Sequence, residues 1–238
     1  MYNRSNPVKR TRTHRLGAGH VSELTTNRLS IYLRCLGQLQ ARGVVTASSQ
    51  TLASELRLNA AQIRKDLACF GEFGVRGVGY SVDGLAAHLR HILGLGSPIR
   101  VGVIGAGHLG QALADYSGFP REGFEPVALF DRAPEKIGSR SRGGVPIYDV
   151  RRLKAIARRE RIRIAMISVP AGAAQRAVNQ AVKAGISAIL NFAPGPLAVP
   201  PGVKLKNVDL TVSLESLAYH LARYHDAKNE DTRRPEPR

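Results

Sequence analysis

The sequence predicts an α/β protein built from two domains, and three patterns in the chain carry this prediction. In the first third, apolar residues recur at helical spacing and are followed by a short stretch rich in glycine and valine. After residue 98, short runs rich in valine and isoleucine alternate with helical segments, which is typical of a parallel sheet with right-handed crossovers. The length of 238 residues fits two domains, and 43% hydrophobic residues are enough for buried cores.

The chain is strongly basic. It has 35 Lys and Arg against 18 Asp and Glu, a formal net charge of +17, which favours a polyanionic partner such as nucleic acid or an anionic membrane face. No apolar run reaches the roughly 18 residues that span a bilayer, and no apolar segment follows the basic N-terminus as in a secretory signal. The two cysteines, Cys35 and Cys69, fit a reducing compartment. We therefore expect a cytoplasmic protein with no membrane partner.

The first domain is expected over residues 28–93. Leucines at spacings of three and four predict an amphipathic helix at residues 28–42. Ser48 or Ser49 is placed to cap a second helix, and Asn59 to cap a third at residues 60–70. The next segment, GEFGVRGVGYSV, has the composition of a tight hairpin. Helices followed by a short hairpin describe a winged helix-turn-helix, a DNA-binding domain.

The second domain is expected over residues 98–212. Its strand candidates are IRVGVIG, FEPVALF, IRIAMISVP and ISAILNF, with helical segments between them. This alternation predicts a Rossmann fold, which is a doubly wound parallel sheet. A last helix within residues 213–225 has an apolar stripe with no evident surface to cover inside one Rossmann unit. The tails, residues 1–27 and 226–238, are expected to be disordered.

A glycine motif joins the first predicted strand of this domain to the helix that follows. Gly105 would make the tight turn, Gly107 would admit a pyrophosphate, and Gly110 would pack the helix against the strand. Asp131 ends the next strand 21 residues after Gly110, which completes the dinucleotide-binding fingerprint. Its carboxylate would bind the ribose hydroxyls and repel a 2′-phosphate, which favours NAD over NADP, whereas Arg132 beside it would tolerate NADP. The candidate loop residues are Gly105, Ala106, Gly107, His108, Leu109 and Gly110.

The reduced and oxidised cofactors, NADH and NAD⁺, differ only at the nicotinamide. The reduced ring is neutral and the oxidised ring is positively charged, so an apolar pocket should prefer the reduced form. Ligands of such sheets bind at the carboxyl ends of the strands. Two strand ends therefore supply the candidate pocket residues, which are Val169, Pro170, Asn191, Phe192 and Ala193.

The N-terminal domain has the charge that DNA binding needs. The first 90 residues carry 13 basic and 5 acidic side chains, a net charge of +8. Arg64 and Lys65 on the third helix are suited to base edges, and Asp66 could orient one of them. Arg76, on the predicted wing, is suited to a phosphate or the minor groove. The candidate DNA-binding residues are Ser48, Asn59, Gln62, Arg64, Lys65, Asp66, Arg76, Gly77 and Tyr80.

Two further patterns have simpler explanations. His88 and His91 lie three apart on a predicted helix, but no carboxylate or cysteine stands beside them in the sequence, so no metal site is expected. The basic run at residues 151–163 is expected to be the solvated face of a helix that flanks the sheet, with a contact to DNA or another anion as the alternative.

Five strings occur in the order IRKDL, RGVGY, GAGHLGQALADY, ILNFAP and NVDL, and with them the chain resembles the Rex family of redox-sensing transcriptional repressors over residues 29–224. The resemblance implies a homodimer that binds an inverted-repeat operator when NADH is scarce and leaves the DNA when NADH binds. It also implies a C-terminal helix exchanged between the subunits. In this family pattern NADH and NAD⁺ act as ligands and are not turned over.

The resemblance also assigns residues. It implies that Arg64, Lys65 and the wing around Arg76 and Tyr80 contact DNA, and that Tyr116 lies near the nicotinamide. Asp209 would take part in a contact between subunits that reports the cofactor state. Some relatives carry an arginine able to pair with this aspartate where this chain has His108, and histidine changes its charge near neutral pH.

Two alternatives belong to other functional classes. An NAD-dependent dehydrogenase with an accessory DNA-binding domain would need a substrate domain, but the roughly 140 residues after the winged helix are used by one nucleotide-binding domain. A nucleic-acid scaffold that uses the Rossmann fold only for dimerisation would bind no NADH. We therefore expect a regulator and not an enzyme.

Overall fold

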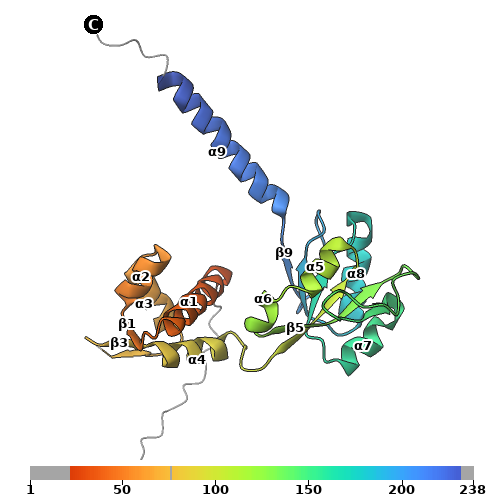
Figure 1. Cartoon of the computed structure of the whole chain (residues 1–238), viewed down its shortest axis with the longest axis horizontal. Helices are drawn as coiled ribbons and strands as arrows, with labels where there is room; N and C mark the ends of the chain where they lie inside the picture. Colours follow the sequence, from red (N-terminus) through yellow and green to blue (C-terminus); the bar gives the residue numbers. More distant parts are fainter. Residues whose placement is uncertain (1–21, 76, 232–238) are drawn as a thin grey trace, which may run out of the picture. The chain divides into compact units, whose positions relative to one another are not determined.

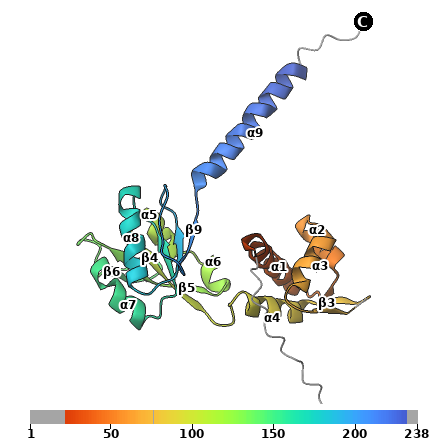
Figure 2. The same cartoon turned by 180° about the vertical axis from the view of Figure 1, so that it is seen from behind.

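The computed structural model describes residues 22–75 and 77–231, with side chains described as far as Arg223. The chain divides into two compact units, Met1–Ser97 and Pro98–Arg238. Figures 1 and 2 show both units from opposite sides. Arg76, one of the candidate DNA-binding residues, lies outside the described residues, as do residues 1–21 and 232–238.

The N-terminal unit has the order helix, strand, two helices and a two-stranded hairpin, followed by one more helix. Its elements are α1 (Glu23–Ala41), β1 (Thr46–Ala47), α2 (Ser49–Leu56), α3 (Ala60–Ala68), β2 (Gly74–Val75), β3 (Gly79–Ser81) and α4 (Val82–Ile92). The strands form an antiparallel sheet in the order β1-β3-β2. This order is that of a winged helix-turn-helix, in which α3 is the recognition helix and the β2–β3 hairpin is the wing.

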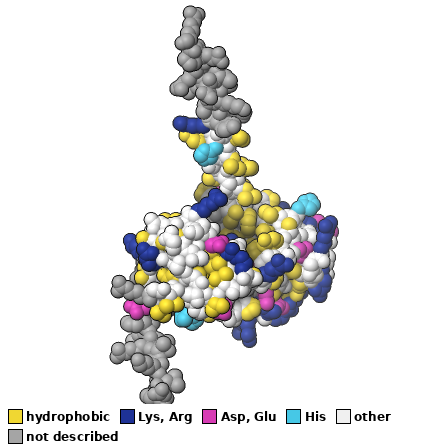
Figure 3. Space-filling view, turned by 60° about the vertical axis from the view of Figure 1, so that its left-hand side comes forward, with side chains coloured by type: hydrophobic (Ala, Val, Ile, Leu, Met, Phe, Trp, Pro, Cys, Tyr) yellow, Lys and Arg dark blue, Asp and Glu magenta, His cyan; other side chains and the backbone are white. Residues whose placement is uncertain are grey.

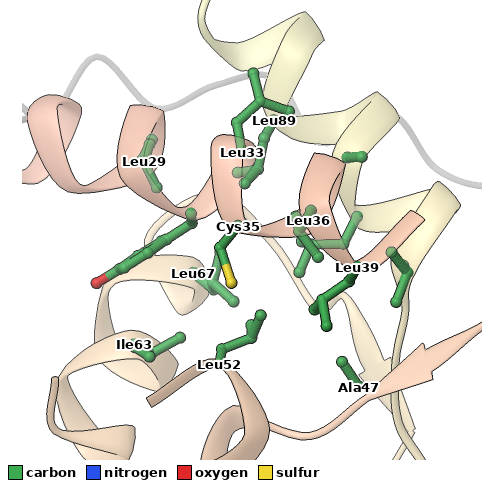
Figure 4. Close-up of a cluster of buried hydrophobic side chains, with 14 of the residues drawn as sticks. Leu29, Leu33, Cys35, Leu36, Leu39, Ala47, Leu52, Ile63, Leu67 and Leu89 are labelled. Atoms are coloured by element: carbon green, nitrogen blue, oxygen red, sulfur yellow. The ribbon is translucent and has the colours of Figure 1, made fainter. Parts of the chain in front are cut away.

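One buried cluster holds this unit together. Figure 4 shows leucines of α1 meeting side chains from α2, α3 and α4, among them Leu52, Leu67 and Leu89. On α3, Ile63 and Leu67 are buried, whereas Arg64 and Lys65 are exposed. The predicted division of the third helix into a core face and a polar face is therefore present in the structure.

The first helix begins earlier than the sequence predicted. Residues 23–27, assigned to a disordered tail, form the first turns of α1, and the Ser22 side chain accepts a hydrogen bond of 3.1 Å from the backbone N–H of Thr25. The prediction of the boundary was wrong because it followed the apolar spacing, which starts at Leu29. The N-cap of a helix precedes its first buried residue.

The C-terminal unit is a six-stranded parallel sheet with the strand order β6-β5-β4-β7-β8-β9. Its elements are β4 (Ile99–Ile104), α5 (His108–Ala114), α6 (Gly118–Arg121), β5 (Phe124–Asp131), β6 (Ile147–Asp149), η1 (Val150–Arg152), α7 (Leu153–Arg159), β7 (Ile164–Ile167), α8 (Ala171–Lys183), β8 (Ala188–Asn191), β9 (Lys204–Asn207) and α9 (Leu210–Asp231). Numbered from β4, this is the 3-2-1-4-5-6 order of the Rossmann fold. The four predicted strands are present, and β6 and β9, at the two edges, were not predicted.

Alternating residues of the strands are buried on the two faces of the sheet. Val101 and Val103 of β4 pack in a cluster with Ala114 and Phe119 from the α5–α6 side. Ile104 of β4 packs in the other cluster with residues of α7 and α8. The strand order reverses between β4 and β7, so the crevice outside their carboxyl ends is the place where this fold binds ligands.

The last helix is longer than predicted. The helix α9 runs over Leu210–Asp231, so residues 226–231, which were assigned to a disordered tail, are helical. That prediction was wrong because it weighed the charge of the segment and not the helix propensity of its Ala, Lys and Glu residues. All side chains of residues 209–223 are exposed, and Figure 3 shows hydrophobic side chains along this helix.

Candidate functional site

The glycine loop lies between β4 and α5, and two of its glycines are required by close backbone contacts. Gly105 has φ of 105°, and a Cβ there would lie 2.9 Å from Cγ1 of Val169 and overlap the Ser168 backbone. A Cβ on Gly110 would overlap the carbonyl oxygen of Gly105 and lie 2.8 Å from Oγ of Ser168. The loop is therefore packed against the end of β7 at both of these positions.

Gly107 differs from its two neighbours in the motif. It has an ordinary φ of −75°, precedes the first residue of α5, and a Cβ placed on it would meet nothing within 4 Å. His108 and Leu109, in the first turn of α5, are exposed, so this end of the helix is open. The packing of the protein itself does not require a glycine at position 107, and the open space there leaves room for a phosphate group at the helix N-terminus.

Asp131 ends β5 beside this loop. Its carboxylate accepts hydrogen bonds from the backbone N–H groups of Ala106 at 2.8 Å, Arg132 at 2.8 Å and Ala133 at 3.0 Å. Burial acts to raise the pKa of Asp131, but the backbone hydrogen bonds from Ala133 and Ala106 and the charge of Lys136 outweigh it and lower the pKa. The carboxylate is therefore ionised at neutral pH and fixed to the glycine loop.

Two residues of this site were missed by the sequence reasoning. The ammonium of Lys136 lies 3.5 Å from Oδ2 of Asp131, and the Ser168 hydroxyl donates to the carbonyl oxygen of Gly105 at 3.0 Å. Lys136 lies five residues after the acid, so proximity in the sequence was a usable signal. For Ser168 the only signal was a hydroxyl residue near the end of the third predicted strand, IRIAMISVP.

The strand ends that were expected to line a nicotinamide pocket differ in their exposure. Val169 is half-buried and Pro170 is exposed, directly after β7. Asn191, at the end of β8, is fully buried; its amide donates to the carbonyl of Ala193 at 2.8 Å and to the side chain of Asn207 at 2.9 Å. These bonds connect the ends of β8 and β9, so Asn191 fixes the backbone conformation of the segment Phe192–Ala193.

Tyr116 is an exposed aromatic side chain that is held in position. Its ring is 58% exposed and packs edge-to-face on Phe119, with 5.0 Å between the ring centroids. A Cβ on Gly118 would lie 2.5 Å from Cζ of Tyr116, so the ring lies directly over this glycine. The tyrosine is therefore held in place by Phe119 and Gly118 while much of its ring stays accessible to a ligand.

Asp209 has a local structural role. One of its carboxylate oxygens accepts a hydrogen bond of 2.9 Å from the N–H of Thr211, so Asp209 caps α9. Among the described residues of this single chain, no hydrogen bond or ion pair joins it to His108. A contact of Asp209 across a subunit boundary stays a prediction.

The helix-turn-helix residues are fixed by caps and by one side-chain contact. Ser48 caps α2 through the N–H of Thr51 at 3.0 Å, and Asn59 caps α3 through the N–H of Ala61 at 2.7 Å. A guanidinium nitrogen of Arg64 donates to the Ser49 hydroxyl at 2.9 Å, which holds the arginine on the exposed side of the helix. Ser48 and Asn59 therefore have structural roles at the helix starts, where their backbone also reaches the surface.

Asp66 is buried and does not share the exposed face of α3 with Arg64 and Lys65. It is 3% exposed and accepts hydrogen bonds from Arg28 at 2.6 and 2.8 Å, from the Tyr32 hydroxyl at 2.7 Å and from Gln62 at 2.8 Å. These bonds, with that from Arg28 foremost, lower the pKa of Asp66 to about 2 despite its burial. The expectation that Asp66 orients Arg64 or Lys65 was wrong, because its side chain points inward to α1.

The wing and α3 enclose an open groove of about 520 Å³. Arg64 lines it from α3, and Gly77, Gly79 and Tyr80 line it from the hairpin. Gly77, at the hairpin turn, has φ of 83° and open space around it, which a turn of this kind requires. The Tyr80 ring is half-buried over Gly74, so it stiffens the wing in addition to lining the groove.

The described part of the chain holds neither a cluster of metal-ligating residues nor a membrane-spanning helix. No group of three or more His, Cys, Asp or Glu residues there could hold a metal ion. His88 instead packs against Phe73, with ring centroids 5.2 Å apart, and its ring nitrogen bonds to the carbonyl of Gly84. Of the helices between residues 22 and 231, none has both the length and the apolar character needed to cross a bilayer.

Comparison with known proteins covers nearly the whole chain. Residues 97–195 match the CoA binding domain family, and residues 20–68 match a family described as the N-terminus of putative DNA-binding proteins. The chain is 46% identical over 201 residues to the redox-sensing transcriptional repressor Rex of Desulfitobacterium hafniense, covering 84% of this chain and 95% of that protein. It is 47% identical over 201 residues to Rex of Pelotomaculum thermopropionicum, covering 84% and 94%.

Solved structures agree with these relatives. The crystal structure of RSP in complex with β-NAD⁺ and operator DNA matches with a TM-score of 0.82 and 37% identity, over 91% of this chain and 100% of that one. RSP is described as a Rex-family repressor. Its structure in complex with β-NADH matches with a TM-score of 0.77 and 37% identity, over 89% and 99% of the two chains. The chain belongs to the Rex family of redox-sensing transcriptional repressors.

Proposed function

We propose that this protein is a transcriptional repressor that reads the ratio of NADH to NAD⁺ in the cytoplasm. It binds an inverted-repeat operator as a homodimer and leaves the DNA when NADH binds. The observation that carries this proposal is the presence, in one chain, of a winged helix with exposed basic residues and a complete dinucleotide fingerprint. The similar proteins are named as repressors, which supports a regulator that does not turn over its cofactor.

The cofactor site fits a dinucleotide. The open space at Gly107, the exposed first turn of α5 and the ionised Asp131 together suit a pyrophosphate and a ribose. The bound cofactor supplies a nicotinamide ring whose charge depends on its redox state. The residues that we assign to cofactor binding are Gly105, Ala106, Gly107, His108, Leu109, Gly110, Tyr116, Asp131, Arg132, Val169, Pro170, Asn191, Phe192 and Ala193.

The DNA site follows from the exposed residues of α3 and the wing. Arg64 and Lys65 are exposed on the recognition helix, and we assign base-edge contacts to them, with Gln62 at the rim of the same face. The hairpin around Gly77 and Tyr80 is assigned to the backbone and the minor groove, together with Arg76. Ser48 and Asn59 place helix starts at the surface, where backbone N–H groups suit phosphates.

The decisive experiment is a titration of an inverted-repeat operator complex with NADH and, in parallel, with NAD⁺. Because only the nicotinamide differs, we expect release by NADH at concentrations where NAD⁺ has little effect. The variant Arg64→Ala, Lys65→Ala is the DNA-binding control and should lose operator affinity while still binding NADH. Equal release by both cofactors, or turnover of NADH with 2-oxo acids or aldehydes, would contradict the proposal.

Tyr116→Ala is expected to lower the preference for NADH over NAD⁺ and to leave DNA binding by the cofactor-free protein intact. The exposed ring of Tyr116 supplies apolar surface. The positively charged nicotinamide of NAD⁺ would have to lose bound water to contact this surface, whereas the neutral ring of NADH pays no such cost. Calorimetry with both cofactors measures the preference, and Tyr116→Phe, which keeps the ring, is the control. If the Tyr116→Ala protein dissociates from operator DNA at the same NADH concentration as the parent, the nicotinamide does not bind beside Tyr116.

The choice between NADH and NADPH is expected to depend on the Asp131–Lys136 pair. The parent should bind NADH more tightly, since a 2′-phosphate would face the carboxylate, and Asp131→Asn should reduce this preference. Lys136→Gln should increase it, because the ammonium 3.5 Å from the carboxylate offsets part of the repulsion. Each change is expected to be roughly tenfold in the affinity ratio, about 1.4 kcal/mol. Equal affinities of the parent for both cofactors would exclude Asp131 as the determinant.

Removal of α9 is expected to abolish operator binding. The helix exposes Leu214, Leu217 and Leu221 at 59–65% of their surface, and an isolated chain offers nothing to cover them. A chain that ends before Val212 should therefore be monomeric or unstable in sedimentation experiments. An inverted-repeat operator needs two recognition helices one DNA turn apart, about 34–36 Å, and only a dimer holds them at this spacing. A chain without residues 232–238 is the control; a dimeric protein lacking α9 with normal operator affinity would refute the assignment.

A further inference from the structure

We propose that the exposed face of α7, with the turn that follows it, is a second binding surface for double-stranded DNA. The inference rests on the proposed function, since it assumes a protein that works on DNA. The net charge of +17 is not confined to the winged helix: residues 98–238 hold 22 basic and 13 acidic residues, a net charge of +9. Of this, residues 151–163 contribute seven basic residues against one acidic residue. We call these seven side chains the α7 surface.

One face of α7 is used by the fold, and the other is free. Leu153, Ile156 and Ala157 are 2–3% exposed and pack in the cluster between the sheet and α8. Figure 1 shows α7 on the outside of the sheet. Lys154 and Arg158, one helical turn apart, are exposed on the opposite side, and neither side chain has a hydrogen bond or ion pair with any described residue.

The acidic residues nearby pair with only two of the seven side chains of this surface, Arg151 and Arg159. Asp149 is bound by Arg151, with 2.8 Å between its Oδ2 and the guanidinium Nε. Glu160 is shared by Arg159 at 2.9 Å and Arg100 at 3.1 Å. Both carboxylates are thus already paired, while Lys154, Arg158, Arg161 and Arg163 keep their full charges toward solvent. Such a concentration of one sign of charge attracts a polyanion.

Arg161 gives a second, independent observation. It follows the C-cap of α7 with φ of 53°, and the N–H of Ile162 bonds to the carbonyl of Ala157 at 2.9 Å, which is the helix end that normally takes glycine. Among the described residues, the only other non-glycine with positive φ is Arg57, in the turn between α2 and α3. A strained backbone at a position occupied by a charged side chain indicates a use for that side chain.

The chemistry of the surface favours duplex DNA over the other polyanions. A helix that lies on a membrane inserts apolar side chains between its basic ones, but the apolar residues of α7 are buried against the sheet. Single-stranded nucleic acid is bound by stacking on aromatic rings, and residues 151–163 contain none. The ring beside this surface, that of Tyr148, is half-buried and already lies under the Arg159 guanidinium, 5.5 Å from the ring centroid. Arginine-rich surfaces without either feature suit the phosphate backbone of a duplex, with no requirement for sequence.

The test is the salt dependence of binding to a duplex that lacks the operator sequence, measured by fluorescence anisotropy with the full-length protein. For Lys154→Gln, Arg158→Gln we expect weaker binding and a slope of log affinity against log salt that is smaller by about 1.8, the value for two lost phosphate contacts. The matched control is Arg121→Gln, Arg142→Gln, which removes the same charge from two exposed positions, one at the end of α6 and one in the loop between β5 and β6. Its slope should be unchanged.

Arg161→Gly separates binding from folding. Glycine adopts the positive φ freely, so the melting temperature should rise or stay the same, while affinity for the duplex falls. A role of Arg161 in folding alone would instead leave the affinity for DNA unchanged.

The outcomes distinguish this inference from the proposed function. If Lys154→Gln, Arg158→Gln and its control show the same salt-dependence slope, the α7 surface does not bind DNA. This holds even if NADH still releases the protein from the operator. Stronger retention on anionic vesicles or duplex RNA than on duplex DNA also overturns it. Failure of the parent to bind the operator or respond to NADH contradicts the proposed function instead, whatever the α7 variant does.

Discussion

Asp66→Ala is expected to unfold the N-terminal unit and to abolish operator binding, although Asp66 does not face the DNA. The substitution leaves the half-buried Arg28 and Gln62 side chains and the fully buried Tyr32 hydroxyl without their shared acceptor. Leaving the buried Tyr32 hydroxyl unsatisfied costs about 1–3 kcal/mol, and the lost hydrogen bonds of Arg28 and Gln62 to a charged acceptor add to this cost. A domain of this size has a free energy of unfolding of roughly 5 kcal/mol or a little more, so most of its stability is lost. Urea denaturation monitored by hydrogen exchange in α1 and α3 measures the effect on this unit separately.

The matched control is Glu55→Ala. Glu55 also pairs with an arginine of the first helix region, Arg42, at 2.7 Å, but both side chains are substantially exposed. An exposed ion pair contributes about 0–1 kcal/mol. A loss for Asp66→Ala no larger than that for Glu55→Ala would show that the buried bonds add nothing to stability.

The same carboxylate makes the stability of the N-terminal unit depend on pH. The folded pKa of Asp66, about 2, is below the usual value of 3.8, so its contribution is complete above about pH 4 and is lost as the pH falls through 2. This lowering of the pKa corresponds to roughly 2 kcal/mol of stability. The gap in stability between the parent and Asp66→Asn should therefore be constant from pH 5 to 7 and narrow below pH 4. A constant gap down to pH 2 would contradict the lowered pKa.

Gly110→Ala is expected to lose stability, whereas Gly107→Ala is expected to lose only its affinity for NADH. A Cβ at position 110 overlaps the Gly105 carbonyl, so Gly110→Ala should destabilise the C-terminal unit by several kcal/mol and lose cofactor binding as a consequence. A Cβ at position 107 meets nothing within 4 Å, so Gly107→Ala should keep the melting temperature of the parent. It should still bind NADH at least a hundredfold more weakly, about 2.7 kcal/mol, because the methyl group occupies the space for the pyrophosphate.

Thermal unfolding and NADH calorimetry on both variants check this pair. The control is Gly37→Ala in α1, where a Cβ is also unobstructed and which belongs to the N-terminal unit. Normal NADH affinity in a stable Gly107→Ala protein would mean that the pyrophosphate does not approach the start of α5.

The sequence could predict what depends on neighbours along the chain. The glycine loop, Asp131 and the caps at Ser48 and Asn59 each act on groups a few residues away or on the next strand, so spacing was enough to find them. Strands β6 and β9 escaped because they are short edge strands of three and four residues, with little apolar pattern. The limits of α1 and α9 escaped because apolar spacing marks where a helix is buried and not where it begins or ends.

By itself, the sequence determined the two-domain order, the class of ligand and the basic character of the protein, because composition and short-range spacing encode these. Only the tertiary structure decided which polar residues serve the core. Asp66 belongs to a buried network with residues 38 and 34 positions earlier, and not to the DNA face beside its neighbours in the chain. Ser168 lies under the glycine loop although 63 residues separate it from Gly105. Spacing tells which side chains share a face of one element, but the partner of that face is set by packing between distant segments.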